Sequence, residues 1–100
     1  MQCSWLHVDG DYNKNNYIIY DSQDRYLEED ELKEFTLDEL ALIRNEIYAM
    51  NNMEFKSEPY LTYFNNKSWY VGYCDNVEFD YLSEEAKANI KLIKDMEKRK

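Results

Sequence analysis

The strongest constraint on the fold is the stretch of residues 36–55, whose residue pattern predicts one long helix. Thr36 is a good N-cap residue, and Glu39 three positions later completes a capping box that satisfies two otherwise unpaired backbone donors. At roughly 100° per residue, one broad face of the helix collects apolar side chains. These are Leu37, Leu40, Ala41, Ile43, Ile47, Tyr48 and Met50. Arg44 and Asn51 fall near the middle of the same face, where apolar residues are expected.

Capping residues mark the remaining helix boundaries. The main helix is expected to end at Asn51 or Asn52, because Asn52 can take the left-handed position that Gly usually fills. Ser57 is predicted to cap a short third helix with Pro59 in its first turn, and its expected buried residues are Tyr60, Leu61, Tyr63 and Phe64. Ser83 is predicted to cap the last helix. The inner face of that last helix, from Glu84 to about Lys98, is expected to carry Ala86, Ile90, Ile93 and Met96.

The other segments give weaker signals. Leu27, Leu32 and Phe35 suggest a short first helix with acidic residues in its first turn, where the helix dipole favours them. Residues 4–20 could form two short strands around a polar loop. Residues 65–82 are expected to form an ordered loop pinned by aromatic side chains, namely Trp69, Tyr70, Tyr73, Phe79 and Tyr81. The sequence therefore predicts a mainly α fold, a small single domain of about four helices, and it allows a short N-terminal β-hairpin.

Composition limits the possible functions. One hundred residues make one domain with a single modest core, and a hydrophobic content of 44% is ordinary for a globular chain. A net charge of −9 argues against direct binding of nucleic acid, because contact with phosphates needs a basic surface. No apolar run approaches the length of a membrane helix, and no signal peptide is visible at the N-terminus.

Cysteine and metal-ligand patterns are sparse. Cys3 and Cys74 are too few for a disulfide framework, so free thiols are expected, while a single bridge between them stays open. The spacing of residues 9, 11 and 13 is that of a calcium loop, but Lys14 and Tyr20 replace two required residues. His7 has no partner at zinc-ligand spacing. No metal or cofactor is predicted.

Four motifs occur in a particular order along the chain. They are Tyr17-Ile18-Ile19-Tyr20-Asp21-Ser22-Gln23-Asp24-Arg25-Tyr26-Leu27, Glu39 to Ala49 with Arg44-Asn45-Glu46-Ile47-Tyr48-Ala49, then Trp69-Tyr70, and Ala88 to Ile93 with Glu97. This order resembles the YARHG domain, a bacterial module usually found in secreted or surface-anchored proteins. The resemblance implies a domain of about four helices over residues 17–100, with residues 1–16 as an N-terminal extension or strand. It also implies binding to the cell wall, in particular to peptidoglycan, without catalysis.

The chain departs from the family in its signature. The family's Tyr-Ala-Arg-His-Gly reads here Tyr48-Ala49-Met50-Asn51-Asn52. Replacement of Gly by Asn is mild, because Asn tolerates positive φ better than most residues. Loss of Arg and His removes a cation and a titratable ring, the groups best able to hold a carboxylate or transfer a proton.

Seven side chains are candidate binding residues: Arg44, Glu46, Tyr48, Asn51, Trp69, Tyr70 and Asn89. Arg44 must be paired if it is buried, because an unpaired buried charge would cost several kcal/mol. It forms a structural ion pair, a set of contacts with backbone carbonyls or, with Asn51 and Asn89, a pocket for a carboxylate. The aromatic residues form either part of the core or a stacking surface for sugars.

Two functions follow. The first is a non-enzymatic binding module, extracellular or at the cell surface, that recognises wall glycan and peptide or a surface protein. The alternative is a cytoplasmic acidic interaction factor that inhibits a basic, nucleic-acid-handling partner. The sequence contains no nucleophile elbow, P-loop or zinc-hydrolase motif, so an enzyme is not predicted.

Overall fold

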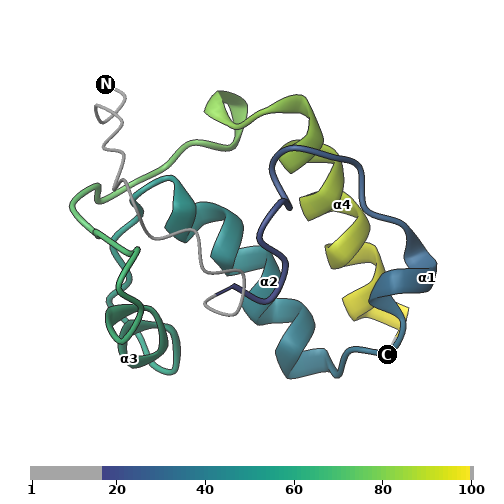
Figure 1. The fold of residues 1–100 in the computed structure, drawn as a ribbon, viewed down its shortest axis with the longest axis horizontal. Coiled ribbons are helices and arrows are strands. Elements are labelled where there is room, and N and C mark those ends of the chain that lie inside the picture. The colour runs from purple at the N-terminus through teal and green to yellow at the C-terminus, as the bar shows by residue number, and fades with distance from the viewer. Residues whose placement is uncertain (1–16, 100) are drawn as a thin grey trace.

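The computed structural model describes residues 17–99, in which four α-helices and one 3₁₀ turn follow one another along the chain. They are α1 (Glu29–Leu32), α2 (Leu37–Met50), α3 (Tyr60–Asn65), η2 (Phe79–Tyr81) and α4 (Glu84–Arg99). Figure 1 shows α2 crossing the middle of the molecule between α3 and α4, and α1 packs against α4. No strand forms in the described residues, which contain one isolated parallel bridge between Met53 and Cys74. The predicted mainly α class of about four helices is confirmed.

Local sequence sets both ends of α2. Thr36 Oγ1 accepts a hydrogen bond from Glu39 N at 3.2 Å, and Glu39 Oε1 accepts one from Thr36 N at 2.8 Å. Asn52, just beyond the helix, has a φ of 69°, the left-handed conformation that ends the helix. The predicted capping box and the predicted left-handed Asn52 are both confirmed.

The core lies between α2 and α4. Leu40, Ile43 and Ile47 of α2 are fully buried, as are Ile90 and Ile93 of α4. The last helix is capped as predicted, because Ser83 Oγ accepts a hydrogen bond from Ala86 N at 3.0 Å. The predicted inner face of α4 is also confirmed, since Ala86, Ile90, Ile93 and Met96 are all buried.

The inner face of α2 is rotated from the predicted one. Its buried residues are Leu40, Ile43, Glu46, Ile47 and Ala49. Leu37, predicted to be on the inner face, is 48% exposed. The prediction took all apolar positions as one face, whereas α2 is covered on two sides, by α4 and by the aromatic residues around α3.

Two expectations for the region around α3 are wrong. Ser57 does not cap the helix with its side chain; Glu58 accepts hydrogen bonds from the Thr62 N and hydroxyl instead, at 3.0 and 2.5 Å. Ser57 comes too early, since α3 begins at Tyr60. Of the four residues expected to be buried here, Tyr60, Leu61, Tyr63 and Phe64, only Phe64 is fully buried.

The chain after α3 returns along the end of α2. Trp69 is buried, while Tyr73 and Tyr81, which were expected to pin this segment, are 43% and 57% exposed. Tyr70 donates a hydrogen bond to Met53 O at 2.5 Å. Its ring lies so close to Gly72 that a Cβ there would meet the Tyr70 hydroxyl at 2.0 Å. Gly72 is therefore required by this close approach.

Residues 18–20 form bends and the start of a turn, so the prediction that residues 17–20 form the second strand of an N-terminal hairpin is wrong. The physical reason is that the N–H groups of Ile18 and Ile19 donate to the Glu46 carboxylate, which replaces the partner strand. The first strand of that hairpin, the loop with calcium-like spacing, His7 and Cys3 all lie outside the described residues.

Cys74 is buried and takes part in a disulfide bond whose other half lies outside the described residues. The expectation of a free thiol is therefore wrong for Cys74. Spacing in the sequence could not decide this, because a disulfide depends on two residues meeting in the folded chain.

Candidate functional site

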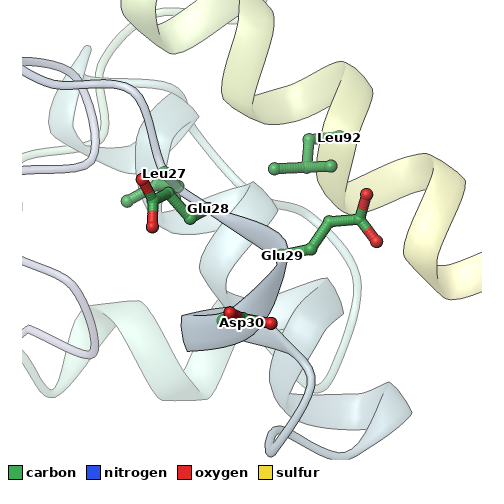
Figure 2. A pocket seen from close by; sticks show the side chains of 5 residues that line it. All are labelled: Leu27, Glu28, Glu29, Asp30 and Leu92. Atoms are coloured by element: carbon green, nitrogen blue, oxygen red, sulfur yellow. The ribbon is translucent and has the colours of Figure 1, made fainter.

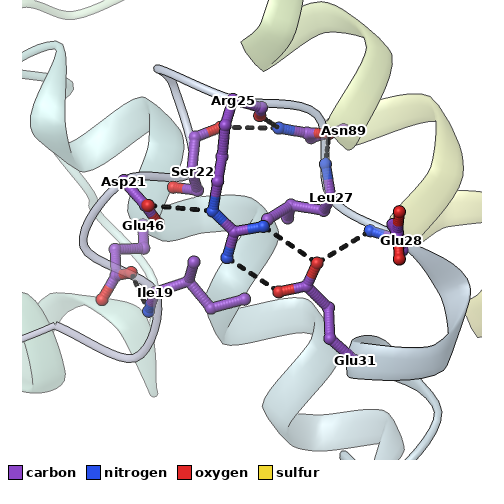
Figure 3. Close-up of polar contacts among 9 residues, drawn as sticks. All are labelled: Ile19, Asp21, Ser22, Arg25, Leu27, Glu28, Glu31, Glu46 and Asn89. Atoms are coloured by element: carbon purple, nitrogen blue, oxygen red, sulfur yellow. Dashed lines mark hydrogen bonds and ion pairs between the residues drawn. The ribbon is translucent and has the colours of Figure 1, made fainter.

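Residues 17–27, here called the lead-in segment, lie against α2 and α4 and are fixed there by polar side chains from both helices (Figure 3). Asn89 of α4 makes three hydrogen bonds with the backbone of this segment. Its Nδ2 donates to Ser22 O and to Arg25 O, both at 2.8 Å, and its Oδ1 accepts from Leu27 N at 2.8 Å. Asn89 is 1% exposed, and its bonds with Leu27 N and Ser22 O are buried, while its bond with Arg25 O is partly buried.

Gln23 is held by two further side chains. Asn51, just after α2, donates from Nδ2 to Gln23 Oε1 at 2.7 Å and to Ile47 O at 2.8 Å. Ser83 donates to Gln23 O at 2.7 Å while it caps α4. Asn51 and Asn89 therefore both bind the lead-in segment, Asn51 at the Gln23 side chain and Asn89 at the backbone of residues 22, 25 and 27.

Arg25 forms ion pairs on the solvent-exposed side of the lead-in segment. Its guanidinium bonds both carboxylate oxygens of Glu31 at 2.8 and 2.9 Å and Asp21 at 2.8 Å (Figure 3). The hydrogen bonds with Glu31 and Asp21 raise the pKa of Arg25, and the bond with Arg25 lowers the pKa of Glu31. This cluster is exposed to solvent, so it orients the loop more than it stabilises the fold.

Glu46 holds the beginning of the same segment. Its side chain is fully buried, and its carboxylate accepts hydrogen bonds from Ile18 N at 2.9 Å and Ile19 N at 3.1 Å. Burial raises the pKa of Glu46 to about 7, against the opposing effects of the two backbone donors and of Lys67. Burial prevails because removal of a carboxylate from water disfavours its charged form.

Arg44 forms a bidentate ion pair across the helix interface. Its Nε lies 2.7 Å from Glu97 Oε1 and its Nη2 lies 3.2 Å from Glu97 Oε2. This pairing raises the pKa of Arg44, and the nearby Tyr60 and Tyr48 hydroxyls contribute. Nη1 of Arg44 makes no hydrogen bond with a described residue.

The aromatic candidates differ in their burial. Trp69 is buried and stacks on Tyr17 with ring centroids 4.6 Å apart and an angle of 17° between the planes. Tyr48 and Tyr70 are half-buried, and burial raises the pKa of both. Both hydroxyls are therefore protonated near neutral pH, where they can donate hydrogen bonds.

A shallow depression lies between α1 and α4. Figure 2 shows its lining, Leu27, Glu28, Glu29 and Asp30 on one side and Leu92 on the other. Glu29 and Asp30 pair with Arg99 and Lys33, whereas Glu28 makes no ion pair with a described residue. None of the seven candidate residues lines this depression.

The seven candidates therefore lie in different surroundings. Glu46, Trp69 and Asn89 are buried and hold the lead-in segment or the core, while Arg44 and Tyr48 share a half-exposed stripe of α2. Sequence reasoning missed Gln23 and the backbone groups of residues 18, 19, 22, 25 and 27 as partners in these contacts. Glu97 was detectable, since it ends the motif order described above.

The described residues contain neither a metal-binding cluster nor a membrane-spanning helix. No group of three or more His, Cys, Asp or Glu side chains in residues 17–99 could hold a metal ion. No helix in this part of the chain is long and apolar enough to cross a membrane.

Comparison with known proteins identifies the family. No curated protein and no solved structure matches the chain. The sequence model of the YARHG domain matches residues 15–98, and this family comprises small, non-catalytic binding-type modules that are usually extracellular. Because the match covers most of the chain, the protein belongs to the YARHG domain family.

Proposed function

We propose that the protein is a non-enzymatic binding module of the bacterial cell envelope, and that its ligand is wall material of the peptidoglycan type. The observation that carries the proposal is the family match over residues 15–98. Peptidoglycan presents sugar hydroxyls together with peptide carboxylates. The site should therefore combine a cation with aromatic hydroxyl groups.

The half-exposed stripe of α2, together with Tyr60 at the start of α3, supplies these groups. Arg44 keeps its Nη1 free of described partners, and the hydroxyls of Tyr48 and Tyr60 are near enough to act on its pKa. Glu97 fixes the guanidinium, so a ligand carboxylate would meet a fork that is already oriented. A sugar ring would rest against the tyrosine edges. The remaining candidates contribute by holding this face in place.

The disulfide of Cys74 supports an extracellular location. Disulfides form and persist in oxidising compartments and are rare in the cytoplasm, where glutathione and thioredoxin keep thiols reduced. Within the proposal, the module works outside the cytoplasm. Labelling of thiols in protein taken from its native host would test this, because an unblocked Cys74 thiol would contradict it.

Sedimentation with isolated cell-wall sacculi tests the function. The wild-type protein should be enriched in the pellet, and both Arg44→Lys and Tyr48→Phe should weaken this enrichment. Arg44→Lys keeps the charge but loses the fork, and Tyr48→Phe loses only a hydroxyl. Tyr81→Phe is the control, because Tyr81 is an exposed tyrosine on η2, outside the stripe. Absence of enrichment, or equal enrichment of all four proteins, would contradict the proposal.

A second candidate function has one observation in its favour, the acidic depression of Figure 2 together with a net charge of −9. It is an interaction factor that binds a basic protein partner. Capture of such a partner should weaken as salt rises, because salt screens exposed charges. Salt-insensitive capture, or none, would count against this function.

A further inference from the structure

The solvent side of α4 carries three lysines that the site described above does not use. Lys91, Lys94 and Lys98, here called the lysine row, are all exposed. At 3.6 residues per turn they fall within about 60° of the helix circumference and extend over about two turns, roughly 10 Å. Lys87, one turn earlier on the same side, is half-buried and pairs with Glu84 at 3.1 Å. The row therefore presents one exposed cation after another along a straight line.

The charge of the lysine row is not neutralised within the described residues. None of its three ammonium groups forms an ion pair with a described residue. Two acids of the same helix, Asp95 and Glu97, are already paired with arginines. Lys91 lies over the Phe79 ring, 5.7 Å from its centroid, a contact that places the ammonium group without cancelling its charge.

The helix itself does not account for this arrangement. Like charges three and four positions apart on a helix repel each other and destabilise it. The helix dipole favours cations only in the last turn, which includes Lys98 but neither Lys91 nor Lys94. Anions bound along α4 would replace this repulsion by attraction.

The shape of the row distinguishes between anionic partners. A broad anionic surface such as a membrane would also meet the exposed Asp95 beside the row, on a chain with a net charge of −9. Most apolar residues of α4 are buried in the core, so the helix has no free apolar face to insert into lipid. Lysine acts as a point charge that suits phosphate, whereas the planar fork of arginine matches a carboxylate. A single line of phosphates is the partner that fits.

We propose that the lysine row is a docking surface for a linear phosphodiester polymer of the cell wall, whose phosphates lie along α4. The inference rests on the envelope location in the proposed function, but its surface and its ligand are different from those of the α2 stripe. The polymer adds an electrostatic contact that does not require recognition of a sugar or a peptide.

Titration with purified poly(glycerol phosphate) tests the inference. A linear phosphodiester releases counterions when it binds cations, as single-stranded nucleic acid does, so three contacts predict a slope of log affinity against log salt of about −2. The double variant Lys91→Gln with Lys94→Gln should bind about tenfold more weakly or worse, with a slope of about −0.7. Lys33→Gln with Lys56→Gln is the matched control, because it removes two exposed lysines outside α4 and should bind like the wild type.

Absence of binding to the polymer, or equal weakening in the control variant, would overturn the inference. Tighter binding to phosphatidylglycerol vesicles or to poly(U) RNA would also overturn it, because the partner would then be a membrane or a nucleic acid. Sacculi stripped of phosphodiester polymer by acid separate the inference from the proposed function. The Lys91 and Lys94 double variant should be enriched on them like the wild type, whereas a wild-type protein that ignores them contradicts the proposed function and not the polymer result.

Discussion

Replacement of Asn89 by Leu should be among the most damaging single changes in the chain. Leu has a similar volume but no polar atoms, so it would leave Leu27 N–H, Ser22 O and Arg25 O without their partner. Each buried polar group left unsatisfied costs about 1–3 kcal/mol. With three such groups, one of them only partly buried, the expected loss is about 3–6 kcal/mol. Domains of this size are typically stable by about 5–15 kcal/mol, so the variant should be close to unfolding.

Urea denaturation followed by far-UV circular dichroism measures this loss. Asn45→Leu is the matched control, because Asn45 is half-buried and donates only to Ala41 O within its own helix, at 2.8 Å. Its replacement should change the free energy of unfolding by about 0.5 kcal/mol or less. The reasoning fails if Asn89→Leu costs no more than Asn45→Leu, because the lead-in segment would then not depend on the three bonds.

Three further changes probe other contacts by the same denaturation measurement. Glu97→Gln should cost about 1–3 kcal/mol, because Arg44 stays half-buried without its counter-charge, and an unchanged midpoint would refute this. Ser22→Ala should be neutral or stabilising by up to about 1 kcal/mol, because the buried Ser22 Oγ bonds no described residue, and a clear loss would reveal a hidden partner. Gly72→Ala should cost about 1–3 kcal/mol, because the new methyl group displaces the Tyr70 ring, and wild-type stability would contradict this close contact.

The altered family signature now has a structural account. Met50 is the last residue of α2 and packs with the clusters on both sides of the helix. Asn51 binds Gln23, and Asn52 takes the left-handed conformation while its side chain donates to Val71 O at 3.1 Å. Asn52 thus performs the turn for which the family uses Gly. In this chain, Asn51 fastens the lead-in segment and cannot supply a titratable ring.

Much of the secondary structure was predictable because its causes are local. Thr36 and Glu39 cap α2, Ser83 caps α4, and Asn52 ends α2, all through bonds or torsion angles that span a few residues. Apolar residues at helical spacing also fixed the inner face of α4. The errors arose where a distant group intervened. The sequence pattern of residues 17–20 predicted a strand, but the N–H groups of Ile18 and Ile19 donate to the side chain of Glu46 and not to a partner strand.

The sequence by itself determined the helices and their caps, because capping hydrogen bonds and apolar periodicity depend only on residues a few positions apart in the chain. Only the tertiary structure decided what the polar residues inside do. Arg44 pairs with Glu97, Asn89 hydrogen-bonds the backbone of the lead-in segment, and Glu46 accepts hydrogen bonds from the N–H groups of residues 18 and 19. The partners in these contacts lie from 27 to 67 positions apart in the chain. A buried polar group must find a partner, but which partner it finds depends on how the helices pack.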